Sequence, residues 1–511
     1  MEDEMKISDK FTSAAERFFL ISGSIIFLIA LCILLTTDER LFRNVSNLRL
    51  FAFDLLILAV LYIGYSVSRK KGEHRWKHPY MLLTGSYLLL FLLQCLYVHF
   101  TYFYTGWDVG LMQMRVEAVL SGHTMQEVSG DTGYSIYPNN LFLFYVQYLI
   151  SRTGELLSMK RPYNLCIYIS CLCVNLSCFL GSLVVRKAFS GHFIRFLYLV
   201  VSTVFILFSP WIVIPYSDTY GMLFATLGIW AVCCLQKPVF RWPVLAFSSL
   251  IGYHIKPTCI FPLFAAFLLF VPGILIRIRE KKQELCILLI SCFLFSGIGA
   301  GISPWIQYSL SFRIDPELRQ PPYHFMMMGL NVDSKGGFYG DDYFFTNSIP
   351  TYDEKVRLIK EEIRLRWNQM TARQKISHFT TKFLHCFNDG TFAWNTLRKS
   401  AISENDNRLN DLCLEIFHPE GKYFTLYYDI AQAIWLLLMS GIPLLFLSRN
   451  DQTSNKAFFM IVLCGLLAFL MLFEAGGRYL FLYAPAFLIL SLYGYEGLFF
   501  KICNCSKPNF I

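Results

Sequence analysis

Runs of about twenty apolar residues recur along this 511-residue chain, and each is long enough to cross a bilayer as a helix. With 55% hydrophobic and 16% charged residues, a soluble fold would expose aggregating apolar patches. The first run lacks a small-residue cleavage site, so we expect an uncleaved span. The sequence predicts an all-α integral membrane protein, a polytopic bundle of about 12 transmembrane helices. They are 18–36, 50–67, 81–103, 163–185, 196–215, 219–236, 242–255, 258–276, 285–303, 427–447, 456–473 and 479–500.

Lys and Arg concentrate in the short loops that would share one side of the membrane. The positive-inside rule places these loops and both termini in the cytoplasm, with the protein in the cell membrane. The loop 37–49, with Arg40, Arg43 and Arg49, is the exception. The retention of basic loops in the cytoplasm explains the formal net charge of +9, so we expect no nucleic-acid partner. The sixteen Cys show no disulfide framework and no zinc spacing.

This topology divides the chain into five parts. The parts are three N-terminal spans (1–103), a first long extracytoplasmic loop with juxtamembrane helices (104–162), a transmembrane core (163–303), a mixed extracytoplasmic segment (304–426), and three last spans with a short cytoplasmic tail (427–511).

The two long outer parts contain three further features. The apolar piece Pro138–Val146 is too short to cross and predicts a juxtamembrane or re-entrant helix. Thr351 with Glu354 predicts a capping box that starts a surface helix. Residues 321–342 read as a long glycine-rich loop without its own core, and such loops are usually functional.

Charged residues at the outer ends of the spans are candidates for function, because an unpaired charge at a membrane boundary is costly. Asp108 follows the third span, although a solvated helix-end carboxylate is the simpler interpretation. Asp218 separates two spans and could instead cap a helix. Lys256, with His254 beside it, needs an anionic partner unless it snorkels to the interface.

The last of these charges is Arg478, which with Tyr479 begins the final span after Glu474-Ala475-Gly476-Gly477. An arginine can bind a phosphate bidentately, and the glycines permit a close backbone approach. Glu474 could instead be a structural ion-pair partner. Carboxylates and cations from four parts of the chain thus converge on one leaflet, which favours a lipid-phosphate substrate over a channel.

In their order along the chain, these motifs resemble the polyprenyl-phosphate-sugar-dependent membrane glycosyltransferases of the GT-C fold, near the bacterial protein O-mannosyltransferase and aminoarabinose transferase group. The resemblance covers about residues 81–300 and 474–490 and rests on the order of weak motifs. The motifs are Gly106-Trp107-Asp108, the basic turn 186–191, Ser209-Pro210-Trp211 through Asp218, Gly252 to Thr258, and Arg478-Tyr479-Leu480.

The resemblance implies a sugar donor on a polyprenyl phosphate and an extracytoplasmic glycan or protein acceptor, with 163–303 as the catalytic core. Asp108 would be the base. Lys256 and Arg478 would stabilise the leaving phosphate, with His254 and Tyr479 beside them. The acceptor loop would contain Tyr137, Asn139, Asn140 and Asn331. A divalent metal, Mg or Mn, has candidate ligands in Asp218 and, more weakly, in Asp341 and Asp342.

Three other classes stay open. A polysaccharide polymerase or ligase would use similar lipid carriers. A secondary transporter or flippase would place ionisable residues deep in its spans, whereas the charges noted here gather at one face. A scaffold without catalysis would leave the outer Lys256 and Arg478 unexplained.

Overall fold

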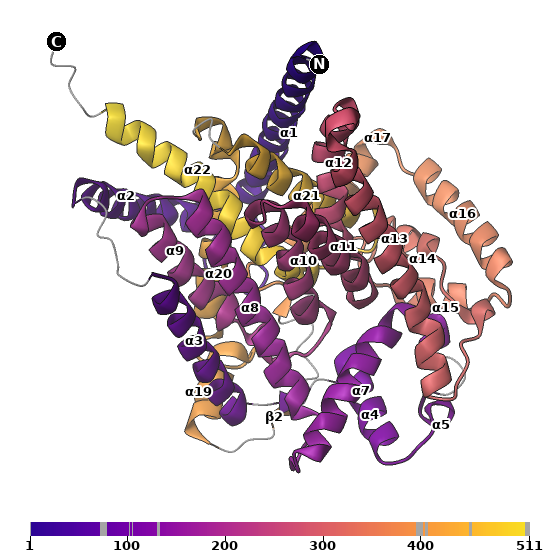
Figure 1. The fold of residues 1–511 in the computed structure, drawn as a ribbon. Coiled ribbons are helices and arrows are strands. Elements are labelled where there is room, and N and C mark those ends of the chain that lie inside the picture. The colour runs from indigo at the N-terminus through magenta and orange to yellow at the C-terminus, as the bar shows by residue number, and fades with distance from the viewer. Residues whose placement is uncertain are drawn as a thin grey trace, which may run out of the picture.

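A computed structural model describes residues 2–71, 79–101, 103–104, 106–129, 133–394, 402–403, 407–448 and 452–505. These residues are almost entirely helical (Figure 1). The strands in the described ranges are β1 (Phe103–Tyr104) and β2 (Ile402–Ser403), which pair antiparallel although they are far apart in the sequence. The all-α membrane fold is therefore confirmed.

The helices fall into five groups along the chain. The first group is α1 (Glu2–Thr36), α2 (Asn47–Lys71) and α3 (Pro79–Thr101). The second is α4 (Asp108–Leu120), α5 (Met125–Ser129), α6 (Gly133–Ile136), η1 (Pro138–Asn140) and α7 (Leu141–Leu156). The third is α8 (Asn164–Ala188), α9 (His192–Ser202), η2 (Thr203–Leu207), η3 (Pro210–Val213), α10 (Ser217–Cys234), α11 (Pro238–Ile255), η4 (Pro257–Ile260), α12 (Phe261–Ile276) and α13 (Ile278–Ser309).

The remaining groups follow α13. The fourth is η5 (Pro316–Leu318), α14 (Pro322–Gly329), α15 (Gly340–Ser348), α16 (Tyr352–Gln369), α17 (Ala372–Phe387) and α19 (Arg408–Phe417). The fifth is α20 (Phe424–Gly441), η6 (Pro443–Leu447), α21 (Thr453–Leu472), η7 (Gly477–Tyr483) and α22 (Ala484–Cys505).

Nine helical stretches in the described ranges are long and apolar enough to cross a membrane, fewer than the twelve expected. The predicted spans 196–215, 219–236 and 242–255 are the three that do not qualify. The first is wrong in length, because the helix ends at Leu207 in a π-helical turn before Pro210. The other two are the helices α10 and α11, which begin with polar or charged turns that dilute their hydropathy.

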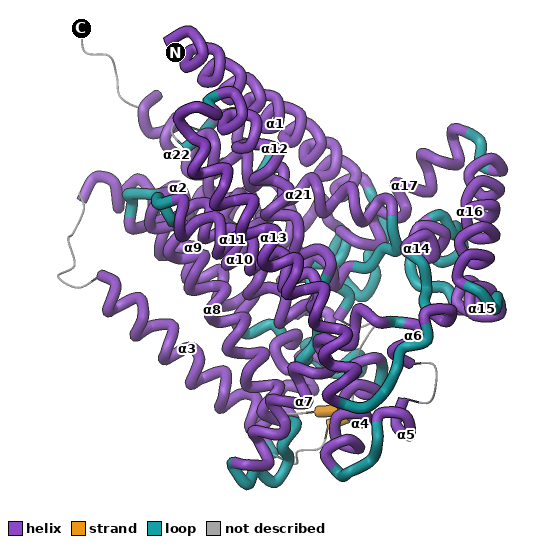
Figure 2. The backbone as a smooth tube through the Cα atoms, turned by 45° about the vertical axis from the view of Figure 1, so that its right-hand side comes forward, coloured by secondary structure: helices purple, strands orange, loops and turns teal. Residues whose placement is uncertain are grey.

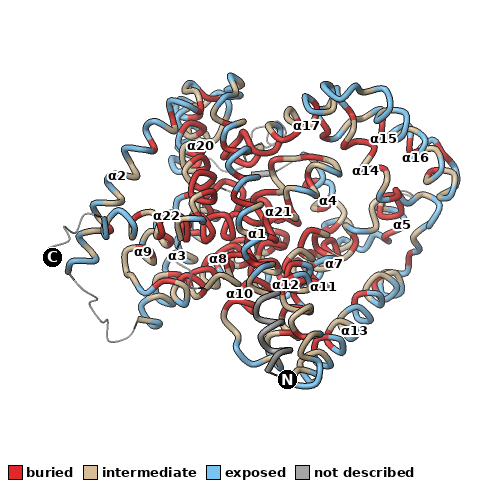
Figure 3. Tube along the Cα trace, turned by 90° about the horizontal axis from the view of Figure 1, so that it is seen from above, coloured by how far each residue is buried: buried red, intermediate tan, exposed pale blue. Residues whose placement is uncertain are grey.

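The centre of the bundle is formed by α8, α10, α20 and α22, where Figure 3 shows the densest burial. Helix α10 packs on α8, on α11 and on η7. Gly252 permits the close contact with α11, because a Cβ there would lie 2.8 Å from Cβ of Phe224. Short central helices are thus held by protein on most sides rather than by lipid.

Two groups of helices lie outside the long bundle helices. Helices α4, α5 and α7 gather at one end of the bundle (Figure 1), and α14 to α17 lie to one side of it (Figure 2). The helix predicted at Pro138–Val146 is confirmed as η1 and α7, which continues to Leu156.

Two expectations for residues 304–426 need correction. The surface helix α16 starts after Thr351 as predicted, but the Thr351 side chain makes no capping hydrogen bond. The region 321–342 is not a loop without a core. It contains α14, whose Met327 and Met328 are buried, because Pro322 supplies a favourable first helical residue before an apolar run.

The arginine-bearing loop 37–49 has a structural explanation. Arg43 is 6% exposed, and its guanidinium donates to the Arg40 carbonyl and to Asn388 Oδ1, both at 3.0 Å. Asn47, which begins α2, also contacts Asn388. Arg43 therefore connects α2 to the end of α17. Buried hydrogen-bond acceptors explain why an arginine lies in this loop, although the loop is an exception to the positive-inside rule.

Candidate functional site

Asp218 and Lys256 form a buried ion pair at the centre of the site. Asp218 lies in the first turn of α10, and Lys256 lies where α11 breaks before η4. The two residues are 1% and 6% exposed. Gly221 allows this approach, because a Cβ there would lie 2.7 Å from Cδ1 of Leu482 and 3.5 Å from Cβ of Lys256.

The pair shows how the charge of Lys256, which needs an anionic partner, is compensated. The anionic partner of Lys256 is a protein carboxylate, and Lys256 Nζ also lies 4.2 Å from the centroid of the Tyr479 ring. The suggested capping role for Asp218 is wrong, because Tyr216 is the N-cap and its backbone N–H donates to Thr219 Oγ1 at 3.2 Å. Asp218 Oδ2 has no hydrogen-bond partner in the described part of the chain.

Arg478, on η7, is enclosed by three aromatic rings. Its Cζ lies 5.0 Å from the ring centroid of Trp107, 5.3 Å from that of Tyr216 and 5.2 Å from that of Tyr479. Such rings stabilise a cation by their quadrupoles without neutralising it. One terminal nitrogen of Arg478 is buried without a hydrogen-bond partner among the described residues. The cation therefore keeps a free donor inside the protein.

Asp108 borders the same aromatic enclosure. It is the first residue of α4 and is exposed, and the Tyr216 hydroxyl donates to its Oδ2 at 3.2 Å. The rings of Trp107 and Tyr216 meet edge to face with centroids 5.1 Å apart. Asp108 is thus both a helix-end carboxylate and a neighbour of the Arg478 site, accessible to a molecule arriving from water.

Glu474 is a further carboxylate of the site, beyond the ion-pair partner of Arg478 that the sequence suggests. The Tyr479 hydroxyl donates to Glu474 Oε1 at 3.3 Å. Burial raises the pKa of Glu474, and Asp108 raises it further, whereas Arg478 lowers it. The sequence signal was its position four residues before Arg478, beside two glycines.

A turn with a strained backbone packs against η7. Phe392 and Ala393 both have left-handed backbones, with φ of 59° and 62°, and Asp389 accepts hydrogen bonds from the N–H groups of Thr391 and Ala393. The Phe392 ring is buried against Phe481 of η7. Strained residues of this kind persist where the surroundings fix them, often at functional sites. This turn holds the backbone that carries Arg478.

Other predicted residues lie away from the site. His254 packs against Phe142 of α7 and against Gly299 of α13. Asn139 is exposed and donates to Asn140 rather than to a site residue. Tyr137 is electrostatically coupled to the site, because burial raises the pKa of its hydroxyl and Glu474 and Asp108 raise it further.

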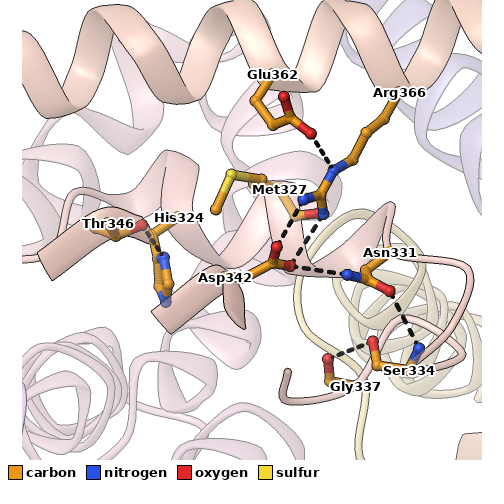
Figure 4. A network of polar contacts seen from close by, with 9 residues as sticks. All are labelled: His324, Met327, Asn331, Ser334, Gly337, Asp342, Thr346, Glu362 and Arg366. Carbon is orange, nitrogen blue, oxygen red and sulfur yellow. Dashed lines mark hydrogen bonds and ion pairs between the residues drawn. The ribbon is translucent and has the colours of Figure 1, made fainter. Parts of the chain in front are cut away.

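Asn331 and Asp342 belong to a separate structural network (Figure 4). Arg366 of α16 donates two hydrogen bonds to Asp342, at 2.6 and 2.9 Å, and one to the Met327 carbonyl. Asn331 donates to the same carboxylate at 3.2 Å. These contacts tie α14, α15 and α16 together.

A metal site does not emerge from the described residues, which hold no cluster of three or more His, Cys, Asp or Glu side chains suited to an ion. Asp218 is paired with Lys256, and Asp342 with Arg366. Asp341 is exposed at the start of α15. A divalent metal stays a prediction.

Buried ionisable residues within the spans, Asp54 and Asp429 among them, were not predicted from the sequence. Asp54 of α2 is 1% exposed, and neither carboxylate oxygen has a hydrogen-bond partner in the described ranges. The expectation that the charges gather only at one face is therefore wrong. The signal was present, since Asp54 interrupts the apolar run 50–67.

The fold and its spans define a polytopic integral membrane protein of α-helices. Within this class, a family model described as conserved hypothetical integral membrane protein matches residues 7–497, so the chain belongs to that family. No curated protein and no solved structure was found to be similar.

Proposed function

We propose that this protein is a membrane glycosyltransferase that transfers a sugar from a polyprenyl-phosphate donor to an extracytoplasmic acceptor. The observation that supports it most is the aromatic enclosure around Arg478, with a buried guanidinium nitrogen that lacks an acceptor in the described chain. A guanidinium remains charged at all relevant pH values and fits phosphate oxygens bidentately. Asp108 lies at the edge of the same enclosure.

The proposed reaction uses these groups as follows. The acceptor hydroxyl attacks the anomeric carbon, and Asp108 takes its proton. The bond between that carbon and the phosphate oxygen breaks, and the phosphate leaves with the electron pair. Arg478 stabilises this charge in a site of low dielectric. Lys256 is a second cation for the phosphate, but it must share its charge with Asp218.

The proposed orientation places the site outside the cell and both termini in the cytoplasm. The distribution of Lys and Arg in short loops supports it. The start of α1 and the end of α22 lie on the same side of the molecule, far from α4 and α7, as this orientation requires (Figure 2).

A secondary transporter or flippase is the second candidate. Asp54 favours it, because buried carboxylates within membrane helices often mark ion or proton pathways. Loss of transport in Asp54→Asn, with no sugar transfer by the unmodified protein, would support this alternative.

The test is binding of a polyprenyl phosphate, together with sugar transfer, by the purified full-length protein in proteoliposomes. Arg478→Gln should weaken binding by roughly ten- to a hundredfold, the worth of a charged hydrogen bond. Asp108→Asn should bind normally and lose roughly two or more orders of magnitude in transfer, because Asn cannot accept the proton.

Two matched variants control for surface effects. Arg152→Gln removes an exposed arginine from α7, and Glu117→Gln removes an exposed carboxylate from α4. Both should behave as the unmodified protein. Equal polyprenyl phosphate affinity in Arg478→Gln and Arg152→Gln would refute the assignment of the phosphate site.

A further inference from the structure

Buried polar atoms without ordinary hydrogen-bond partners lie beside the candidate site, in the segments around α14 and α15. Gln320 is 5% exposed, and among the described residues neither its amide nitrogen nor its amide oxygen has a hydrogen-bond partner of ordinary geometry, apart from a weaker interaction with the Tyr137 hydroxyl. In the same ranges, Nε2 of His324, which is fully buried, and both amide atoms of Asn347 have no hydrogen-bond partner. Groups of this kind are few in native proteins, and each needs an explanation such as a bound ligand.

Tyr137 connects these groups to the site. The backbone N–H of Gln320 donates to the carbonyl of Ile136 at 3.2 Å, so the two segments are in contact. Burial raises the pKa of Tyr137, with Tyr343, Glu474 and Asp108 raising it further, whereas a side-chain hydrogen-bond interaction with Gln320 lowers it. Tyr137 therefore lies within electrostatic reach of both Gln320 and Asp108. Figure 2 places α6 next to the α14 and α15 region.

Aromatic rings accompany the free amides. The rings of Tyr137 and Tyr343 are nearly parallel, with centroids 6.4 Å apart and 15° between their planes. Asn347 lies four residues after Tyr343 and thus on the same face of α15. The His324 ring directs Nδ1 to Thr346 Oγ1 at 2.7 Å and Nε2 away from it (Figure 4).

These groups carry no net charge. Burial lowers the pKa of His324 to about 4, so the ring is neutral at neutral pH. Asp342, the nearby carboxylate, is neutralised by Arg366. Amides donate and accept hydrogen bonds equally, as hydroxyl groups require, and aromatic faces suit the apolar C–H face of a sugar ring. Gln320, His324 and Asn347 are all uncharged at neutral pH, so none of them can pair with an anionic molecule.

We propose that Gln320, His324 and Asn347, with the rings of Tyr137 and Tyr343, bind the acceptor, and that the acceptor is a neutral glycan rather than a polypeptide. This inference rests on the proposed function and names its acceptor class. The acceptor would reach Asp108 past Tyr137, so its hydroxyl-rich body would be held by uncharged donors and acceptors while one hydroxyl meets the base.

The test compares the full-length protein in nanodiscs with Gln320→Leu on an array of neutral oligosaccharides and Ser/Thr-rich peptides. The unmodified protein should bind neutral oligosaccharides, and Gln320→Leu should bind them at least about tenfold more weakly, the usual effect of lost hydrogen bonds to hydroxyl groups. Gln369→Leu, which removes an exposed glutamine at the end of α16, is the matched control and should bind normally.

Thermal stability separates ligand binding from a structural role. A leucine removes two buried polar atoms that have only a weak interaction with Tyr137, so Gln320→Leu should keep or raise Tm while it weakens glycan binding. A lower Tm with unchanged glycan binding would mean that Gln320 is structural, and would overturn the inference. Peptide binding alone, or no binding to any oligosaccharide, would also overturn it.

Failure of this inference can be distinguished from failure of the proposed function. Arg478→Gln should keep glycan binding and lose polyprenyl phosphate binding, and Gln320→Leu should show the reverse. Polyprenyl phosphate binding without glycan binding would refute only the acceptor class. No polyprenyl phosphate binding by the unmodified protein would refute the proposed function itself.

Discussion

Breaking the Asp218–Lys256 pair should destabilise the protein strongly, and removing both charges should restore most of the loss. Both residues are nearly inaccessible to solvent, at 1% and 6% exposure. Removing one partner of a buried pair leaves an uncompensated charge and typically costs about 3 to 5 kcal/mol. We therefore expect Lys256→Met or Asp218→Asn alone to lower the free energy of unfolding by about this amount.

The double variant Lys256→Met/Asp218→Asn is the decisive member of the cycle. It buries no charge at this position, so its free energy of unfolding should lie within about 1 kcal/mol of that of the unmodified protein. Unfolding in mixed micelles at increasing SDS fraction measures these differences. The exposed pair Lys335–Glu39 supplies the control, because Lys335→Met should cost at most about 1 kcal/mol.

Two results would refute this reasoning. Lys256→Met could cost no more than Lys335→Met, which would mean that the pair is solvated. The double variant could cost as much as both single variants together, which would mean that the charges do not interact. If Lys256 also meets the donor phosphate, the double variant should recover stability but still bind polyprenyl phosphate more weakly than the unmodified protein.

Three further predictions follow from individual residues. Asp54→Leu should raise the free energy of unfolding by about 1 to 3 kcal/mol, measured in the same micelles, because it removes buried polar atoms without partners, whereas a loss would reveal a buried water or ion. His324 has a pKa of about 4 when folded and about 6.5 when unfolded, so the unfolded state binds more protons between these values and stability should fall as pH decreases from 6.5 to 4. The loss should reach roughly 3 kcal/mol and be absent in His324→Phe, with hydrogen exchange in α14 as the measurement, and equal pH dependence in both proteins would contradict it. In a background without accessible native thiols, an impermeant reagent outside the cell should label Asp341→Cys but not Lys282→Cys, and the reverse pattern would invert the proposed orientation.

The sequence predicted the long helices well, because hydropathy alone identifies a run that can cross a bilayer. It could not predict where helices end. The helix expected at 285–303 begins at Ile278, since charged residues can continue a helix outside an apolar environment. The span expected at 196–215 ends at Leu207, where a π-helical turn and Pro210 redirect the chain.

The sequence predicted which charged residues belong to the site, but it did not predict which of them are in contact. Asp218 and Lys256 were found separately because each is unusual at the end of a span, but their contact depends on how α10 packs against α11. Trp107 and Tyr216 were not predicted to surround Arg478, because aromatic residues make up 17% of the chain and nothing marks these two. Their role around Arg478 comes from packing between three distant segments.

The two cations of the site differ in what they can still bind, and this difference predicts how pH should affect the donor. Lys256 already has a carboxylate partner, whereas Arg478 lies among aromatic rings, interacts with the Tyr479 hydroxyl and keeps one terminal nitrogen without a partner among the described residues. An incoming phosphate would therefore meet Arg478 first, and would place a new negative charge near Glu474. Burial already raises the pKa of Glu474, and a second anion raises it further, so binding should favour its protonated form. Affinity for the monomethyl ester of polyprenyl phosphate, whose charge does not change with pH, should then increase as pH falls towards the raised pKa of Glu474. Glu474→Gln is permanently neutral and should bind this ester with little pH dependence. The same pH dependence in Glu474→Gln as in the unmodified protein would show that another group takes up the proton.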